Sequence, residues 1–149
     1  MKYLFLFFSV FLLNCSSSSV SVQTNEMNSN SIVFEELYHY NIKLINNESK
    51  IISTQKEMDD LYNKINNANS FPRKPPIPSV EEGSVYLVLQ PIIKKYNDVS
   101  IKEITLSNGI LNISTEEIES PEYKNINKEI AIFLKLSTEK TINKIVIKY

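Results

Sequence analysis

The sequence predicts an α+β fold, in which one N-terminal amphipathic helix packs on a mainly antiparallel sheet of about five to six strands. Three observations lead to this prediction. A helical stripe of apolar residues follows Thr54, several apolar strands follow Gly83, and the pair Asn108-Gly109 separates two of those strands. A β-sandwich or a barrel plugged by one helix is the alternative arrangement.

The composition favours one ordinary domain and excludes several classes of function. The chain has 149 residues, a length typical of a single domain. Its 16 Lys and Arg balance 17 Asp and Glu, so the basic excess of a nucleic-acid-binding protein is missing. One Cys and one His are too few for a zinc site, a disulfide framework or a histidine-based catalytic centre. We therefore expect no cofactor, no metal and no nucleic-acid partner.

The N-terminus has the pattern of a secretory signal peptide. A nearly unbroken apolar run at 3–13 follows Lys2, and it is too short to cross a membrane, which takes about 20 residues of helix. The run ends in Leu-Leu-Asn-Cys at 12–15, which resembles a bacterial lipobox, although Asn14 departs from the usual small residue. We expect cleavage between Asn14 and Cys15 and attachment of lipid to Cys15. The alternative is an incidental thiol behind a plain signal peptide or a short membrane anchor.

Three features favour lipidation of Cys15. It is the only cysteine of the chain and lies where the apolar run ends, Leu12 stands three positions before it, and a run of serines at 16–19 follows it. Two or more acyl chains anchor a protein stably, whereas one chain does not. Residues 1–14 are then the signal peptide, and 15–31 are the lipidated Cys15 and a flexible tether, because a Ser- and Asn-rich segment cannot bury enough surface to fold. Residues 32–149 form a single α+β domain.

The helix is predicted from its cap and its apolar periodicity. Thr54 and Glu57 have capping-box spacing, which predicts the first turn. Positions i, i+3, i+4 and i+7 predict the buried face, and they hold Met58, Leu61, Tyr62 and Ile65. We expect an ion pair between Asp60 and Lys64 and an end within 66–69.

Strands are predicted on both sides of the helix. They are 32–45 and 50–53 before it, and 85–89, 99–106, 110–114, 130–136 and 142–149 after it. Strand 85–89 is apolar on both faces, as a central strand covered on both sides would be. Asn108-Gly109 predicts a type I′ hairpin turn. The four prolines of 71–79 predict a stiff connector, with a Pro-rich ligand for an aromatic groove as the alternative.

No cluster of residues predicts catalysis. His39 lies between two tyrosines in a predicted strand, so we interpret it as a half-exposed strand residue. The chain has two glycines and neither belongs to a nucleophile elbow or a phosphate-binding loop. The acidic clusters are interpreted as solvated surface; they are Glu35-Glu36, Glu81-Glu82 and Glu116-Glu117 with Glu119. The enzymatic alternative is a small envelope hydrolase that uses carboxylates such as Glu35 or Glu116.

Several stretches together carry a resemblance to a known family. They are IISTQKE at 51–57 leading into DLY at 60–62, Pro75-Pro76 before VYLV at 85–88, a hairpin closing on Ile104 and Leu106 before ILNI at 110–113, and the strand 130–136. From about residue 50 the chain resembles the carboxyl-terminal domain of the PrcB-like family, the protease-complex lipoproteins of bacterial envelopes. The family pattern usually has a glycine-rich segment ending in an aromatic after the central strand. Here KKYND at 94–98 keeps Tyr96 without the glycines.

The resemblance implies a non-catalytic accessory role and no catalytic residue. With the N-terminal pattern, it predicts a lipoprotein of the bacterial cell envelope, held by acyl chains on Cys15 in the outer membrane or at the cell surface rather than in the inner membrane. Its expected partner is a secreted or surface protease or another envelope protein, bound through exposed strand edges. The alternative is a surface-exposed lipoprotein that binds a ligand or a host factor.

Overall fold

The computed structural model describes residues 30–68, 75–123 and 129–149. These residues contain seven strands, one α-helix and one short 3₁₀ turn. In chain order they are β1 Phe34–Asn41, β2 Ser49–Ile52, α1 Gln55–Ala68, β3 Ser84–Leu89, β4 Asp98–Ser107, β5 Ile110–Ile118, the 3₁₀ turn η1 Pro121–Tyr123, β6 Ile130–Ser137 and β7 Lys144–Lys148.

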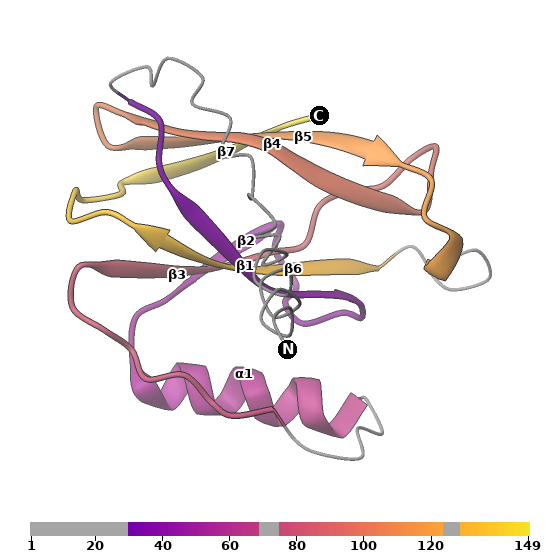
Figure 1. Cartoon of the computed structure of the whole chain (residues 1–149), viewed down its shortest axis with the longest axis horizontal. Coiled ribbons are helices and arrows are strands. Elements are labelled where there is room, and N and C mark those ends of the chain that lie inside the picture. The colour runs from indigo at the N-terminus through magenta and orange to yellow at the C-terminus, as the bar shows by residue number, and fades with distance from the viewer. Residues whose placement is uncertain (1–29, 69–74, 124–128) are drawn as a thin grey trace, which may run out of the picture.

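The strands form two sheets that face each other, with the helix outside them (Figure 1). The four-stranded sheet has the order β1-β6-β3-β2, and the three-stranded sheet has the order β4-β5-β7. Every pairing is antiparallel except that of β5 with β7, which is parallel. The α+β class is therefore confirmed.

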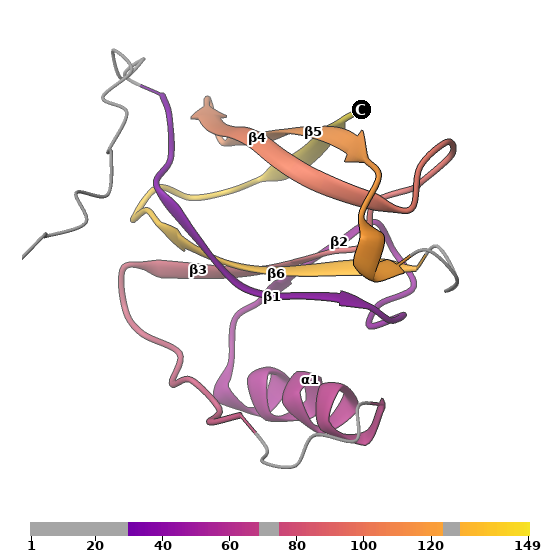
Figure 2. The ribbon, with the colours of Figure 1, turned by 45° about the vertical axis from the view of Figure 1, so that its right-hand side comes forward.

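Two details of the predicted fold are wrong. The helix is not N-terminal to the sheet, because β1 and β2 precede it. The strands also divide between two sheets rather than forming one. The facing sheets match the sandwich alternative, but α1 covers the outer face of the four-stranded sheet and plugs nothing (Figures 1 and 2).

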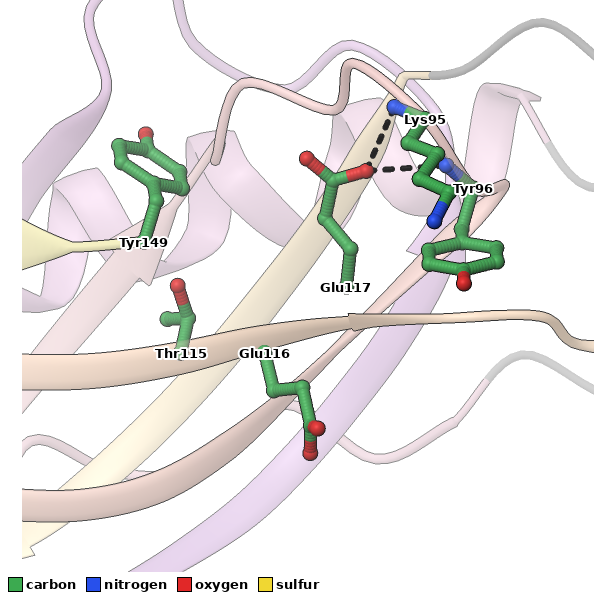
Figure 3. A pocket seen from close by; sticks show the side chains of 6 residues that line it. All are labelled: Lys95, Tyr96, Thr115, Glu116, Glu117 and Tyr149. Atoms are coloured by element: carbon green, nitrogen blue, oxygen red, sulfur yellow. Dashed lines mark hydrogen bonds between the residues drawn. The ribbon is translucent and has the colours of Figure 1, made fainter.

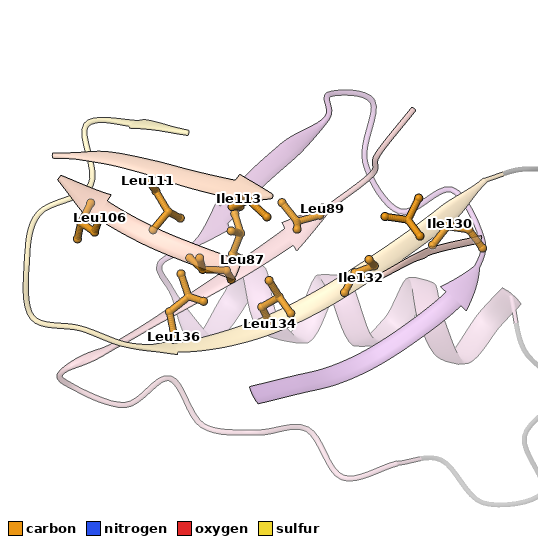
Figure 4. Packing of buried hydrophobic residues seen from close by; sticks show 11 residues of the cluster. Leu87, Leu89, Leu106, Leu111, Ile113, Ile130, Ile132, Leu134 and Leu136 are labelled. Carbon is orange, nitrogen blue, oxygen red and sulfur yellow. The ribbon is translucent and has the colours of Figure 1, made fainter. Parts of the chain in front are cut away.

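Strand β6 explains why the structure needs three layers. Its residues alternate between two buried environments, since Ile132 and Leu134 lie in the core between the sheets while Ala131 and Phe133 lie in the core under the helix. A strand that is apolar on both faces must be covered on both faces. The core between the sheets is almost entirely aliphatic (Figure 4). The core under the helix is partly aromatic, with Phe133 stacked on Tyr86 at 6.0 Å between ring centroids.

Helix α1 begins as its cap predicts. The backbone amide of Glu57 donates to Thr54 Oγ1 at 3.2 Å, and the Glu57 carboxylate accepts from the Ser53 amide at 3.0 Å. The predicted face, Met58, Leu61, Tyr62 and Ile65, is buried. The predicted ion pair is wrong, because Asp60 bonds to Lys56 at 2.8 Å while the Lys64 ammonium donates to the Leu44 carbonyl at 3.3 Å. The buried carbonyl competes successfully for Lys64, and Asp60 has an equally spaced lysine on its other side.

The turns and the connector follow the sequence closely. Asn108 and Gly109 have φ values of 51° and 76°, which the type I′ turn between β4 and β5 requires. Residues 75–81 contain no helix or strand, and Gln55 holds them by accepting from the Val80 amide at 3.0 Å. Residues 71–74 of the predicted connector lie outside the described residues.

The segment that leads into β1 joins the two sheets along one side. The Ile32 amide donates to the Ile104 carbonyl, and the Leu106 amide donates to the Asn30 carbonyl, both at 2.8 Å. Two residues later the same chain pairs with β6 in the other sheet. The sandwich is thus bridged on the β1 and β4 side (Figure 2), while β2 and β7 are the outer strands of their sheets on the other side.

Candidate functional site

A carboxylate from β5 organises the loop before β4. Glu117 accepts hydrogen bonds from three successive backbone amides, those of Lys94, Lys95 and Tyr96, at 3.1, 2.7 and 2.9 Å. Successive amides that converge in this way form a concave anion site, here filled by the protein's own side chain. The sequence prediction placed Glu117 at the surface, where it lies, but missed these three amide partners.

The organised loop forms one wall of a shallow hollow at the end of the three-stranded sheet (Figure 3). The hollow measures about 300 Å³ and is lined by Lys95, Tyr96, Thr115, Glu116, Glu117 and Tyr149. Tyr96 and Tyr149 are 36% and 53% exposed, so two aromatic side chains stand at its rim. Aromatic side chains with a polar tip are typical of protein interfaces.

Tyr149 is fixed at this rim by the chain that leaves β3. Its hydroxyl accepts from the Ile92 amide at 3.0 Å, and the Ile92 side chain is itself 48% exposed. Partial burial raises the pKa of Tyr149, the bond from Ile92 opposes that shift, and the charge of Glu48 adds to it. The phenol is therefore neutral near pH 7 and acts as a hydrogen-bonding group.

Strand β7 leads directly to this rim and has an open edge. It is the last strand of its sheet, and no described strand pairs with its outer side. An unpaired strand edge offers a row of amides and carbonyls to another chain. Tyr149, which lines the hollow and bonds to Ile92, directly follows β7 in the chain. We call the hollow, the exposed Ile92 and this edge together the β7 surface.

A second polar cluster surrounds His39 on β1. The ring nitrogen Nε2 lies 2.7 Å from Asp98 Oδ1, and Nδ1 lies 3.0 Å from Glu36 Oε1. The Tyr123 ring stacks on the imidazole at 6.2 Å, and the Tyr123 hydroxyl donates to the His39 carbonyl at 3.2 Å. The sequence prediction placed His39 correctly in a strand but missed all of these partners.

A β-bulge makes this cluster possible. Residues three apart on a regular strand point to opposite faces, but the register of β1 against β6 shifts between Glu36 and Tyr38. The extra residue, Leu37, packs with Tyr38 against the core under the helix. Glu36 and His39 consequently share the face that looks towards the three-stranded sheet, where Asp98 lies.

The two carboxylates favour the charged form of His39. Burial lowers the pKa of His39, but the hydrogen bond with Glu36 and the charges of Asp98 and Glu36 outweigh it, so the pKa lies above its ordinary value. Both ring nitrogens face acceptors, which leaves neither free to act as a base. The arrangement suits a link between sheets better than proton transfer.

The carboxylates proposed for a hydrolase do not come together. Glu35 pairs across the strands with Lys135, on the face of the four-stranded sheet that looks towards the helix. Glu116 forms an ion pair with Lys102 on the outer face of the other sheet. The sandwich lies between them. Cys15 and the predicted cleavage site lie outside the described residues.

Neither a metal site nor a membrane-spanning helix occurs in the described part of the chain. None of the groups of His, Cys, Asp and Glu in 30–68, 75–123 and 129–149 is arranged to hold a metal ion. Among the same residues, no helix has both the length and the apolar character needed to span a bilayer.

Comparison of the chain with protein-family models, with curated proteins and with solved structures finds no match.

Proposed function

We propose that the chain is a lipid-anchored, non-catalytic interaction module of the bacterial cell envelope. The N-terminal run ending in Cys15 supports the anchor. The observation that carries the interaction role is the β7 surface, where an open strand edge continues into a hollow rimmed by Tyr96 and Tyr149. Strand edges and exposed aromatic side chains are the features by which small domains bind other proteins.

The proposed partner is another envelope protein, for which the PrcB-like resemblance suggests a secreted or surface protease. The departure from that pattern lies within the β7 surface itself, since 94–98 has no glycines. Glu117 holds the three amides of this loop without them. A loop fixed in this way presents the Tyr96 ring at little entropic cost on binding.

Crosslinking in intact cells tests the interaction role. A photo-crosslinking residue replaces Val146 on β7, and the matched control carries it at Lys56, which is on the exposed side of α1. We expect a discrete adduct with another protein from position 146 and none from position 56. The proposal would be overturned if neither position formed an adduct and the chain always purified alone.

Metabolic labelling tests the anchor separately. We expect radiolabelled palmitate to enter the wild-type protein and not the Cys15→Ala variant. Label that persists in Cys15→Ala would show that the lipid, if any, is attached elsewhere.

A further inference from the structure

The backbone of β7 directs alternate residues to its open edge. The Lys144 amide donates to the Gly109 carbonyl, and the Lys148 carbonyl accepts from Thr115 Oγ1. Residues 144 and 148 therefore turn their main-chain groups towards β5. Because the direction alternates along a strand, Ile145 and Ile147 turn their amides and carbonyls towards the open edge. A chain laid beside β7 would find these groups ready to pair.

The side chains of β7 also alternate, and the outer face is basic. Ile145 and Ile147 pack against the core between the sheets. The outer face consequently carries Lys144, Val146 and Lys148, so an apolar residue lies between two ammonium groups. Among the described residues neither lysine forms an ion pair.

The neighbouring strand does not neutralise these lysines. The β5 residues opposite Lys144, Val146 and Lys148 are Ile110, Asn112 and Ser114, none of which is charged. The nearest acidic residues of β5 are already engaged, Glu116 by Lys102 and Glu117 by the amides of 94–96. The next acidic residue in line with Lys148 on this face is Glu103, which lies one strand further away on β4, opposite Ser114. The positive charge along the β7 edge is therefore available to a partner.

We infer that β7 accepts an extended acidic segment of a partner protein as an added strand, whose carboxylates lie opposite Lys144 and Lys148 and whose apolar residue lies opposite Val146. This inference rests on the proposed interaction role and specifies the chemistry of the partner. Opposite charges facing each other across a strand pair stabilise it, and the added strand covers the half-buried Ile145 and Ile147. The matching motif has two acidic residues four positions apart with an apolar residue midway.

A second copy of the chain fits this edge poorly. Antiparallel pairing of β7 with itself places Lys144 opposite Lys148, and parallel in-register pairing places each lysine opposite itself. Like charges directly opposite each other destabilise a strand pair. Lysines at an edge also protect a sheet from unwanted pairing, and if that were their whole role the edge would bind no peptide at all.

Peptide binding to the purified full-length chain in detergent tests the inference. The probe is a labelled peptide with the core Glu-Thr-Val-Thr-Glu, and the charge control has Lys-Thr-Val-Thr-Lys. We expect the acidic peptide alone to bind, and the double variant Lys144→Glu, Lys148→Glu to weaken it about tenfold and to bind the basic peptide instead. The control variant Lys56→Glu makes one such charge reversal on the exposed side of α1, away from the edge, and should bind as wild type does.

Backbone methylation distinguishes an added strand from simple charge attraction. Methyl groups on the peptide nitrogens that face β7 should abolish binding, whereas methyl groups on the alternate nitrogens should leave it unchanged. Equal effects of both methylation patterns, equal binding of acidic and basic peptides, or no binding would each overturn the inference. If these peptides fail while Val146 still yields an adduct in cells, the interaction role stands and only the acidic strand is wrong; if both fail, the role fails too.

Discussion

The imidazole of His39 on β1 lies 2.7 Å from the Asp98 carboxylate on β4, so a polar side-chain contact joins the two sheets in addition to the apolar core between them. Asp98 is 6% exposed and also accepts from the Val99 amide at 2.7 Å, which orients the carboxylate. Tyr123 adds a third element by stacking on the ring and bonding to the His39 carbonyl. The contact therefore fastens β1, β4 and η1 at one corner of the sandwich.

The stability of the protein should depend on pH through His39. The folded-state pKa of this residue is raised above its unfolded value of about 6.5, so the folded state favours the charged ring. The resulting stabilisation is complete below about pH 6.5 and is lost as pH rises through the folded-state pKa. We expect the free energy of unfolding, measured with urea, to decrease across this range.

The variant His39→Gln isolates this effect, because the chain has no other histidine. We expect this variant to be less stable than wild type at pH 6. Its free energy of unfolding should also decrease much less than that of wild type between pH 6 and pH 8. A wild-type profile that rises or stays flat over that range would contradict the assignment.

Removal of the Glu117 carboxylate should loosen the loop at 94–96. Glu117→Ala leaves three backbone amides without their acceptor, and we expect a loss of about 2 kcal/mol in the free energy of unfolding. Amide hydrogen exchange at Lys95 and Tyr96 should become faster. The control is Glu116→Ala, which breaks only an exposed ion pair with Lys102 and should cost less than about 1 kcal/mol. Equal losses for the two variants would argue against the carboxylate's role.

Two glycines allow backbone strain to be separated from steric clash. Both have positive φ, 74° at Gly83 and 76° at Gly109. A Cβ at Gly83 meets nothing closer than Glu139 at 3.8 Å, whereas a Cβ at Gly109 collides with the Asn143 side chain. We expect Gly83→Ala to cost about 1 kcal/mol from φ alone, and Gly109→Ala to cost clearly more. Equal urea midpoints for the two variants would show that Asn143 moves aside freely and would contradict this prediction.

The aromatic core under the helix should tolerate truncation poorly. Phe133 is fully buried between Tyr86 and Tyr62, so Phe133→Ala should cost about 3–5 kcal/mol in thermal or urea unfolding. Val33→Ala is the comparison, since Val33 is 62% exposed and should change stability by less than about 0.5 kcal/mol. A small effect at Phe133 would mean that the helix can close onto the sheet without that ring.

Local signals in the sequence predicted local structure well. The cap of α1 and the Asn108-Gly109 turn depend on residues within a few positions of each other, and both are confirmed. The alternation of β6 side chains between the two cores is likewise a property of one strand. The division into two sheets and the parallel pairing of β5 with β7 depend on how distant strands meet, which periodicity does not encode.

The contacts of the polar side chains were not predicted, for the same physical reason. His39 and Asp98 are 59 positions apart in the chain, and the bulge at Leu37 that turns Glu36 towards His39 has no sequence signature such as a glycine. Glu117 looked like one of several exposed acids, yet its carboxylate oxygens are occupied by a loop that lies 21 to 23 residues away. The sequence around a charged residue in a strand does not indicate which distant backbone amides will bond to its side chain.

Residues 30–41 run from β4 in one sheet to β6 in the other, and this connection affects how the protein unfolds. Residues 30–32 bond to β4 in one sheet, and β1, which follows directly, pairs with β6 in the other. We therefore expect that neither sheet detaches while the other stays folded. If either sheet unfolds, the other loses the segment that connects them, and the core between the sheets becomes exposed to water. Unfolding should accordingly be all-or-none, with no stable half-molecule left for a protease to trim.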